Sequence, residues 1–284
     1  MHIGNYKINL IDTGLFRLDG GAMFGVVPKT LWSKAYNPGD ELNRIPLAAR
    51  PLLIIGEGRN ILIDTGIGTK LNEKLQKIYA IDTSKLDMSL ALNGYGIEPE
   101  DITDVIFTHL HFDHCGGATI KNNGKIKPTF PNAKYYVQKT QLRWAMHPTE
   151  KDRASFFPEN FEPLAADGIL TTLDGAEELF PGISLIPLRG HTEGMQIVKI
   201  SDGKDTLLYC ADLCPTSAHI PLAYGLGYDN NPLVTLEEKR TLIPQVYEEH
   251  WTLCFEHDAF IHASKVISTE KGFARGEEII INEL

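Results

Sequence analysis

The chain has 284 residues, of which 43% are hydrophobic, 37 are acidic and 27 are basic, which gives a net charge of −10. A chain of this length and composition can bury a substantial core, so we expect a folded globular protein. The acidic balance and the absence of a basic run argue against nucleic acid or an anionic membrane as a partner. A small-molecule substrate agrees better with this charge.

The sequence shows no targeting signal and no cysteine motif that would indicate a function. The beginning of the sequence, MHIGNYKINLIDTG, shows no basic segment followed by a long apolar one, and nowhere do 18 consecutive apolar residues occur. We therefore expect a cytoplasmic protein without a membrane partner. The four cysteines form no CxxC pair and are too few for a disulfide scaffold, so we expect reduced thiols.

The first third of the chain predicts mainly strands. YKINLID is typical of one strand, and PLLIIGEGRNILIDTG of a hairpin of two buried strands that turns at GEGRN. The periodicity then lengthens and places Leu71, Leu75 and Ile78 on one helical face. Residues 86–92 predict a second helix that ends near Gly94, and ITDVIFTH returns to strand.

The second half alternates strands and helices again. AKYYVQ predicts a strand, KTQLRWAM a helix, ISLIPLRG a strand, and QIVKIS with DTLLYCAD a hairpin across SDGK. Residues 236–250 predict a helix, followed by strands at TLCFEHD and AFIHASKVI, whereas residues 121–131 and 148–174 predict loops or short helices. Because hairpins interrupt the alternation, we predict an α+β fold, an αββα four-layer sandwich, formed by residues 1–284 as a single domain.

One short segment carries the strongest chemical signal. THLHFDHCGG follows a predicted strand and contains His109, His111, Asp113 and His114 within six positions. In this spacing His109 and His111 can face one way, while Asp113 and His114 reach a second position after the turn. Zinc binds imidazole nitrogen and carboxylate oxygen, usually in a tetrahedral shell, so this loop supplies only part of a metal site.

Three further residues at predicted strand ends could complete the site. His191 follows ISLIPL in LRGHTEG, Asp212 follows TLLYC, and His257 follows TLCF. Either histidine alone would more often be structural. Together with the HxHxDH segment, these residues predict a metal centre built at strand ends.

These motifs resemble the metallo-β-lactamase superfamily over nearly the whole chain: LIDTG at residues 62–66, THLHFDHCGG, GHTEG, the aspartate after LLYCA, and the late histidine. The resemblance implies two mixed β-sheets flanked by helices and two divalent metal ions, with zinc as the first choice, although the same ligands accept manganese, iron or cobalt. It assigns His109, His111 and His191 to one ion, Asp113, His114 and His257 to the other, and Asp212 to both. Asp64 of LIDTG would orient the metal loop through hydrogen bonds without binding metal.

The implied chemistry is hydrolysis. Two ions about 3.5 to 4 Å apart can share a bridging hydroxide at neutral pH, which attacks a carbonyl or phosphoryl centre. Asp212 would orient this nucleophile, and Asp113 would take part as a catalytic carboxylate. Diiron electron-transfer members put a carboxylate in place of His111, and true β-lactamases lack a bridging carboxylate, so the resemblance favours hydrolysis of other esters.

Two looser segments point to a branch of the superfamily. FRLDGGAMFGVVPKTLW and DLCPTSAHIPLAYGLGYDNNP resemble the branch of N-acyl-homoserine lactonases and methyl-parathion-hydrolase-like enzymes. This implies a quorum-quenching lactonase, with an organophosphate or aryl-ester hydrolase as the alternative, and allows a homodimer by analogy. Better-known lactonases carry a substrate-contacting tyrosine three residues after the bridging aspartate. Pro215 stands there in this chain, so that role is not transferred.

Other side chains could contact the substrate instead. His219, Tyr224 and Tyr228 could donate a proton or a hydrogen bond, and we count His219 and Tyr228 among the catalytic candidates. Met23, Phe24 and Val26 could form the wall of an acyl-chain pocket. The plain alternatives are a core or capping role for the histidine and simple packing for the others.

Two further classes remain open. A non-catalytic metal-binding protein could have the same ligands, although all seven ligand positions are filled and nothing signals a loss of catalysis. A thioesterase similar to glyoxalase II would be expected to present a basic patch near its C-terminus, where only Lys265, Lys271 and Arg275 are available.

Overall fold

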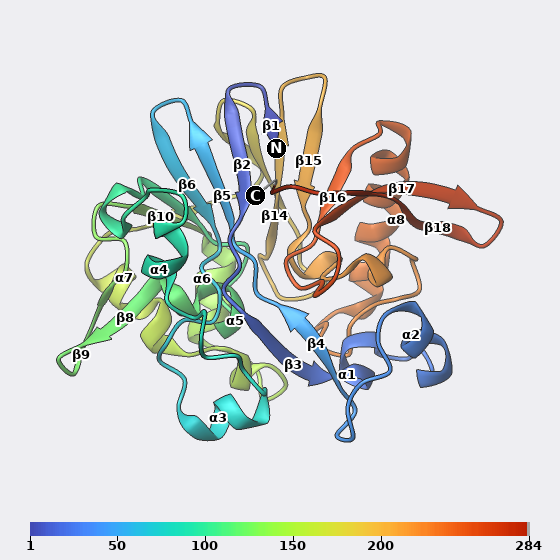
Figure 1. Ribbon diagram of the computed structural model, residues 1–284, viewed down its shortest axis with the longest axis horizontal. Coiled ribbons are helices and arrows are strands. Elements are labelled where there is room, and N and C mark those ends of the chain that lie inside the picture. Colours follow the sequence, from blue (N-terminus) through green and yellow to red (C-terminus); the bar gives the residue numbers. More distant parts are fainter. Residues whose placement is uncertain (283–284) are drawn as a thin grey trace. The chain divides into compact units, whose positions relative to one another are not determined.

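The structure is a computed structural model that describes residues 1–282. The chain forms two compact units: unit 1 comprises residues 1–15 and 49–175, and unit 2 comprises residues 16–48 and the chain from residue 176 onward. Each unit contains one seven-stranded mixed sheet with helices (Figure 1). The predicted α+β class is therefore confirmed, whereas the single domain stays a prediction.

The sheet of unit 1 has the strand order β1-β2-β5-β6-β7-β10-β11. Its strands are β1 (His2–Ile3), β2 (Tyr6–Leu10), β5 (Leu52–Gly56), β6 (Arg59–Ile63), β7 (Asp104–Ile106), β10 (Lys134–Gln138) and β11 (Leu170–Leu173). The first four strands are antiparallel, and β6, β7, β10 and β11 are parallel. The predicted hairpin of β5 and β6 is confirmed. It turns at Glu57 and Gly58, which both have positive φ, as a two-residue type I′ turn requires.

Helices cover one face of this sheet. Unit 1 contains α3 (Glu73–Ile78), α4 (Met88–Asn93), α5 (Phe112–Cys115), α6 (Lys139–Met146) and α7 (Glu162–Ala166). Leu92 of α4, Ala145 of α6 and Leu164 of α7 pack with Leu62 and Val105 of the sheet in one buried cluster. Burial of these apolar side chains holds α4, α6 and α7 against the sheet.

The expectation of loops or short helices at residues 121–131 was wrong. Strands β8 (Thr119–Asn122) and β9 (Lys125–Pro128) form an antiparallel hairpin there. Its turn residues Asn123 and Gly124 both have positive φ, so the Asn-Gly pair in KNNGK was a hairpin signal that the low hydrophobicity of the segment obscured. Within residues 148–174, α7 and short 3-10 turns agree with the expectation, but β11 adds an unpredicted strand that pairs with β10.

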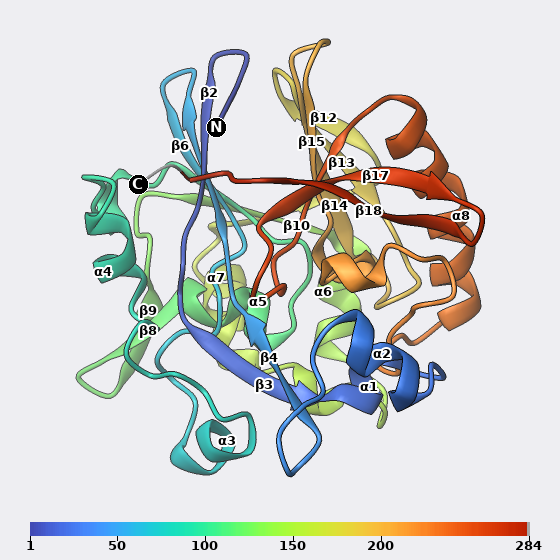
Figure 2. The same ribbon diagram turned by 45° about the vertical axis from the view of Figure 1, so that its right-hand side comes forward.

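The sheet of unit 2 has the order β12-β13-β14-β15-β16-β17-β18. Its strands are β12 (Glu177–Phe180), β13 (Ile183–Pro187), β14 (Gln196–Ser201), β15 (Thr206–Tyr209), β16 (Thr252–Cys254), β17 (Ala263–Thr269) and β18 (Gly272–Ile279). All neighbours are antiparallel except β15 and β16. Helix α8 (Pro232–Glu248) lies beside β17 and β18 (Figure 2), and its Leu242 and Val246 pack against Leu208 and Leu253 of the sheet.

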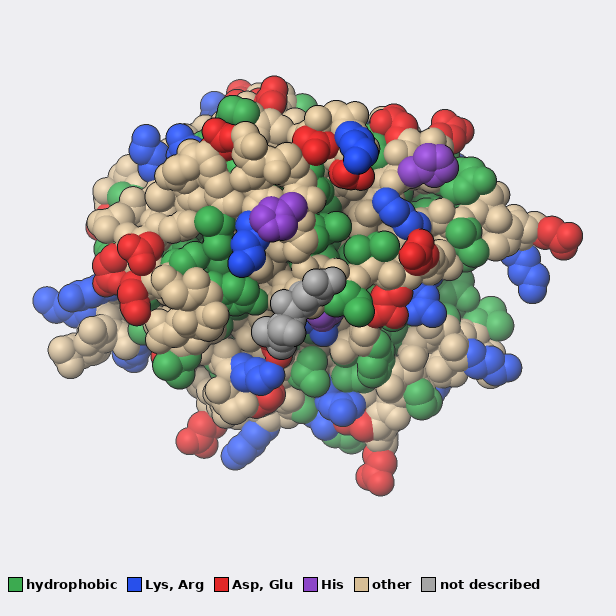
Figure 3. Space-filling view, turned by 45° about the horizontal axis from the view of Figure 1, so that its top comes forward, with side chains coloured by type: hydrophobic (Ala, Val, Ile, Leu, Met, Phe, Trp, Pro, Cys, Tyr) green, Lys and Arg blue, Asp and Glu red, His purple; other side chains and the backbone are tan. Residues whose placement is uncertain are grey.

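Unit 2 also contains the helices α1 (Gly20–Phe24) and α2 (Lys29–Ala35), which the sequence did not predict. They lie between β3 (Leu15–Asp19) and β4 (Arg44–Ala48), which pair as a separate two-stranded sheet. Among the described residues, no helix is long and apolar enough to cross a membrane. On the face shown in Figure 3, acidic and basic side chains are interspersed and do not gather into a patch of one charge.

Two close backbone approaches in unit 1 fix the segment that carries the HxHxDH motif. A Cβ on Gly116 would lie 1.9 Å from the carbonyl oxygen of Ile67, and a Cβ on Gly117 would lie 2.2 Å from that of Thr65. The Thr65 amide also donates a 2.7 Å hydrogen bond to the carbonyl of His114. The motif therefore packs directly on the LIDTG loop at a distance that only glycine allows.

We expect Gly116→Ala to reduce the free energy of unfolding by about 1–3 kcal/mol, because the new methyl group would push two backbone segments apart. The matched control is Gly94→Ala at the end of α4, where the nearest atom to a new Cβ is a carbonyl oxygen 3.6 Å away. Chemical denaturation of both variants measures the difference. Equal stability of the two variants would show that the packing at Gly116 is not tight.

Candidate metal centre

In unit 1 the HxHxDH segment leaves β7 and turns into α5. His109 and His114 are fully buried, and His111 and Asp113 are exposed by only 6% and 8%. Nε2 of His109 lies 3.0 Å from Nδ1 of His111, and the possible ligand atoms of Asp113 and His114 lie within 4.8 Å of each other. Unit 1 thus presents its four candidate ligands as two pairs.

Asp64 orients the ligands of unit 1 through Thr108. Its Oδ1 accepts a 2.8 Å hydrogen bond from the Thr108 amide, and its Oδ2 accepts a 2.6 Å hydrogen bond from the Thr108 hydroxyl. Because this hydroxyl donates its hydrogen to Asp64, it can only accept a hydrogen bond from Nδ1 of His109, which lies 3.1 Å away. Nδ1 of His114 lies 3.1 Å from Asp64 Oδ2. These contacts leave Nε2 of both histidines as the atom that can bind metal.

In unit 2 one carboxylate lies between two histidines. Asp212 Oδ2 lies 3.1 Å from Nε2 of His191, and Asp212 Oδ1 lies 3.2 Å from Nε2 of His257. His191 follows β13, Asp212 sits in a 3-10 turn after β15, and His257 follows β16. The strand ends of unit 2 therefore direct two imidazoles at separate oxygens of Asp212.

The other nitrogen of each histidine in unit 2 is held by the protein. Nδ1 of His191 lies 3.0 Å from Asp229 Oδ1, and Nδ1 of His257 lies 2.8 Å from the carbonyl oxygen of Ala48. Each of these oxygens accepts a hydrogen bond from Nδ1–H, which leaves Nε2 directed toward Asp212. Neither Asp229 nor Ala48 could be identified from sequence, because no motif marks a contact across 38 or 209 residues.

The electrostatics of unit 2 suit a cation. Burial by itself would lower the pKa of His191, but the carboxylates of Asp212 and Asp229 outweigh burial and raise this pKa from 6.5 to about 9. In the metal-free protein an imidazolium at neutral pH therefore supplies the positive charge that these carboxylates need. A divalent cation can take over this role once the proton leaves, so the donor set fits a metal ion.

His219 has a different environment from the ligands. Its Nδ1 lies 2.8 Å from the Thr216 hydroxyl, its Nε2 lies 2.8 Å from the carbonyl oxygen of Met23, and its ring stacks on Phe24 at 4.5 Å. Burial lowers the pKa of His219 to about 4. A neutral ring bonded at both nitrogens favours the core role over proton donation.

The other residues predicted to line a substrate pocket differ in solvent exposure. Met23 and Phe24 are buried, whereas Val26 is 96% exposed. Tyr224 and Tyr228 are half-buried, and the Tyr224 ring meets Phe24 edge-on at 6.1 Å. Phe24 is thus a packing centre of unit 2, and the two tyrosines keep partly exposed side chains.

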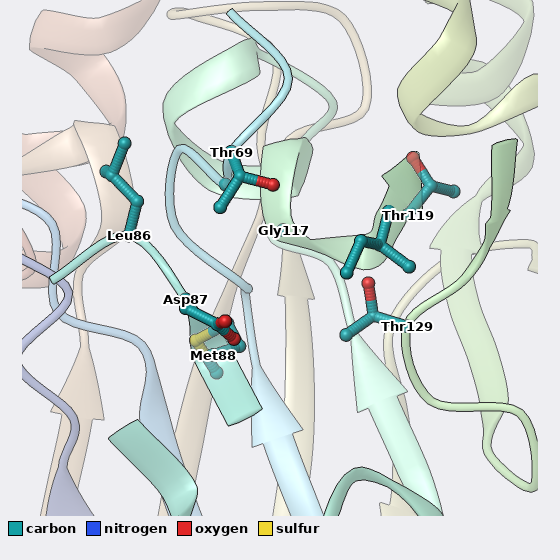
Figure 4. A pocket seen from close by; sticks show the side chains of 9 residues that line it. Thr69, Leu86, Asp87, Met88, Gly117, Thr119 and Thr129 are labelled. Atoms are coloured by element: carbon teal, nitrogen blue, oxygen red, sulfur yellow. The ribbon is translucent and has the colours of Figure 1, made fainter. Parts of the chain in front are cut away.

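Cys115 and a nearby cavity do not extend the site. The Cys115 thiol donates to the carbonyl of Leu110, and burial raises its pKa to about 12, so it stays protonated. Thr119, Thr129 and Asp87 line a cavity of about 10 Å³ beside Gly117 (Figure 4). This volume suits at most a single water molecule, so it is no substrate pocket.

Residues 46–257 match the family model of the metallo-β-lactamase superfamily. This match covers well over half of the chain, and the chain belongs to that superfamily. Its two mixed seven-stranded sheets with their helices are the metallo-β-lactamase fold.

Three individual proteins similar to this chain indicate the type of enzyme within the superfamily. An N-acyl homoserine lactonase of Bacillus thuringiensis is 29% identical over 267 residues, which cover 89% of this chain and 93% of that protein. A solved structure described as a probable metal-dependent hydrolase from Staphylococcus aureus is 31% identical, with a TM-score of 0.88 and coverage of 99% of this chain and 100% of that one. AidC, a dizinc quorum-quenching lactonase solved with a product, is 20% identical with a TM-score of 0.82 and coverage of 99% and 97%, which shows the shared fold. These comparisons support a metal-dependent hydrolase.

We expect zinc binding to release protons and to strengthen as the pH rises toward about 9, because His191 must lose its extra proton to bind metal. The stability of the metal-free protein should depend on pH in the opposite direction. The contribution of protonated His191 to this stability is complete below about pH 6.5 and is lost as the pH rises through about 9. Calorimetric titration of the metal-free protein at pH 7.5, in buffers of different ionisation enthalpy, measures the released protons.

Asp229→Asn removes one of the carboxylates that raise the pKa of His191, so we expect fewer released protons and about 10- to 100-fold weaker zinc binding. Asp167→Asn, at an exposed position after α7, is the control and should match the wild type. If Asp229→Asn releases as many protons as the wild type, Asp229 does not set the protonation of His191.

Proposed function

We propose that the protein is a dinuclear metal-dependent hydrolase that opens lactone rings, with N-acyl-homoserine lactones as its substrate class. The observation that carries the proposal is the pair of contacts from the two oxygens of Asp212 to His191 and His257, 3.1 and 3.2 Å long. A carboxylate that faces two ligand histidines is suited to bridge two ions. The similarity to an N-acyl homoserine lactonase over 89% of the chain supports the substrate class.

In this proposal the ligands divide as the family resemblance implies. By this resemblance one ion would be held by His109, His111 and His191, the other would be held by Asp113, His114 and His257, and Asp212 would serve both. The tautomers fit, because the contacts of His114, His191 and His257 at Nδ1 leave Nε2 of each ring for metal. When bound, two divalent ions such as zinc supply Lewis acidity and lower the pKa of a water molecule toward neutrality.

The side chains of the chain itself orient the reactants. Asp212, which is 7% exposed, can accept a hydrogen bond from the attacking water and direct its lone pair. Asp113 would be the second carboxylate of the site. Tyr224 and Tyr228, with partly exposed side chains, are the proposed hydrogen-bond donors to the substrate, and buried His219 supports the loop that carries them.

An organophosphate or aryl-ester hydrolase of the same fold is the second candidate. Pro215 keeps this candidate open, because the substrate-contacting tyrosine that the resemblance to better-known lactonases would imply is missing from this position. In the structure the Pro215 carbonyl accepts a 3.0 Å hydrogen bond from the amide of His257. This residue therefore contributes to placing a proposed ligand and offers no hydroxyl to a lactone.

The deciding experiment is an assay of the zinc-loaded protein against an N-acyl-homoserine lactone, a simple γ-lactone, a phosphotriester and an aryl ester. We expect the highest kcat/KM with the N-acyl-homoserine lactone and loss of every activity on chelation. Fast phosphotriester cleavage without lactone turnover would replace our proposal by the second candidate. About two bound metal ions without any hydrolysis would instead indicate a non-catalytic metal-binding protein.

We expect Asp212→Asn to lower kcat/KM by at least about 100-fold, because an amide offers one neutral acceptor oxygen where the carboxylate offers two charged ones. Steady-state kinetics together with elemental analysis separates loss of metal from loss of orientation. Asp167→Asn serves again as the control. Wild-type kinetics in Asp212→Asn would remove Asp212 from the proposed mechanism.

A further inference from the structure

Lys239 of α8 is completely buried, yet all three protons of its ammonium group have acceptors. Nζ donates to the backbone carbonyls of His219 at 2.6 Å, Pro221 at 2.8 Å and Tyr224 at 2.9 Å. These acceptors lie within six residues of one another in a single loop. One ammonium group on a long helix therefore binds three backbone carbonyls of the same loop.

This loop, residues 213–231, connects the surroundings of two proposed metal ligands. It begins directly after Asp212. Near its end, Asp229 accepts a 3.2 Å hydrogen bond from the Leu226 amide and contacts Nδ1 of His191 through its other carboxylate oxygen. The Asn230 amide also donates to the carbonyl of His191 at 3.0 Å. A change in the backbone conformation of the loop would therefore shift the hydrogen-bond partners of His191.

The loop has little regular structure to define its path. Within residues 213–231 the described structure contains one 3-10 turn of its own, Ser217–His219, after the end of the turn that carries Asp212. Asp258 holds the first part through Ser217, and the carbonyl of Ala22 holds Gly227. Between these points the three contacts of Lys239 fix the backbone from His219 to Tyr224.

Packing alone does not call for a lysine at this position. Methionine has a similar length and would fill the space without the free-energy cost of burying a charge. Methionine cannot, however, donate hydrogen bonds to three carbonyls. The ammonium group thus organises the backbone of the loop in a way that an apolar side chain of the same size would not.

We propose that Lys239 is a positioning residue of the active site, which sets the conformation of the 213–231 loop and thereby the orientation of His191 and the selectivity for long acyl chains. The inference rests on the proposed function, because Tyr224 and Tyr228 of this loop are the proposed substrate contacts. Lys239 acts only through the loop and touches no reacting atom. The KM of a substrate too small to reach the loop should not depend on Lys239, whereas kcat of any substrate should respond to the orientation of His191.

The test compares Lys239→Met and Lys239→Gln with the wild type and with Lys204→Met, a control at an exposed hairpin turn of unit 2. For Lys239→Met we expect KM for a long-chain N-acyl-homoserine lactone to rise by about tenfold or more, since three hydrogen bonds that order the loop are lost. KM for a small aryl ester should change by less than about threefold. Lys239→Gln, which keeps two donors, should fall between the wild type and Lys239→Met.

Two readouts are independent of turnover. The visible absorption bands of the cobalt-substituted protein should shift in Lys239→Met, because Asp229 and His191 move with the loop. Chymotrypsin should cleave the metal-free variant faster at Tyr224 or Tyr228 than the wild type. Lys204→Met should leave both readouts unchanged.

Unchanged substrate selectivity, cobalt spectrum and proteolysis in a folded Lys239→Met would overturn the inference. If Lys239→Met does not fold, the same measurements on Lys239→Gln decide, and a wild-type result in that variant overturns it equally. Absence of lactone turnover in the wild type would overturn the proposed function instead. The cobalt spectrum and the proteolysis would then still test the role of Lys239 in the loop.

Discussion

The need to compensate the buried charge of Asp212 organises the functional part of unit 2. A carboxylate that is 7% exposed is expensive to bury unless cationic or hydrogen-bonding groups surround it. His191 and His257 lie at its two oxygens, and Asp229 and the Ala48 carbonyl hold the far side of these rings. Strand ends, the loop after Asp212 and β4 all contribute to this arrangement. A divalent cation is the group that such a cluster of donors suits best.

Unit 1 also buries a carboxylate, that of Asp64, and compensates its charge with hydrogen bonds from the backbone and side chain of a threonine. Asp64 has no exposed surface, and its oxygens accept from the amide and hydroxyl of Thr108 and contact His114. The carboxylate therefore acts as a fixed acceptor behind the histidines. Gly116 and Gly117 let the two loops approach closely enough for these contacts, because neither carries a Cβ. Backbone packing and ligand orientation are thus coupled in this unit.

Much of the local structure could be predicted, and the failures have physical reasons. The helix at KTQLRWAM and the hairpin around Gly58 have strong local signals, and the structure contains both. Helices α1 and α2 were not predicted, since GGAMF and KTLWSKA are short, and glycine disfavours a helix. Packing on buried Trp32 and Phe24, whose rings stack at 5.4 Å, stabilises them instead. Such contacts have no periodicity that a sequence can reveal.

The type of candidate site could be predicted from the sequence, because HxHxDH at a strand end brings side chains that can bind metal close together without help from the rest of the chain. The sequence also indicated the superfamily. Which nitrogen of each histidine is available depends on the folded chain, since the partners of His191 and His257 come from residues 38 and 209 positions away. The same holds for Lys239, which reads as a polar helix residue in the sequence and is a buried anchor in the fold. Hydrogen bonds between distant segments form only after folding brings them together, and local patterns do not record them.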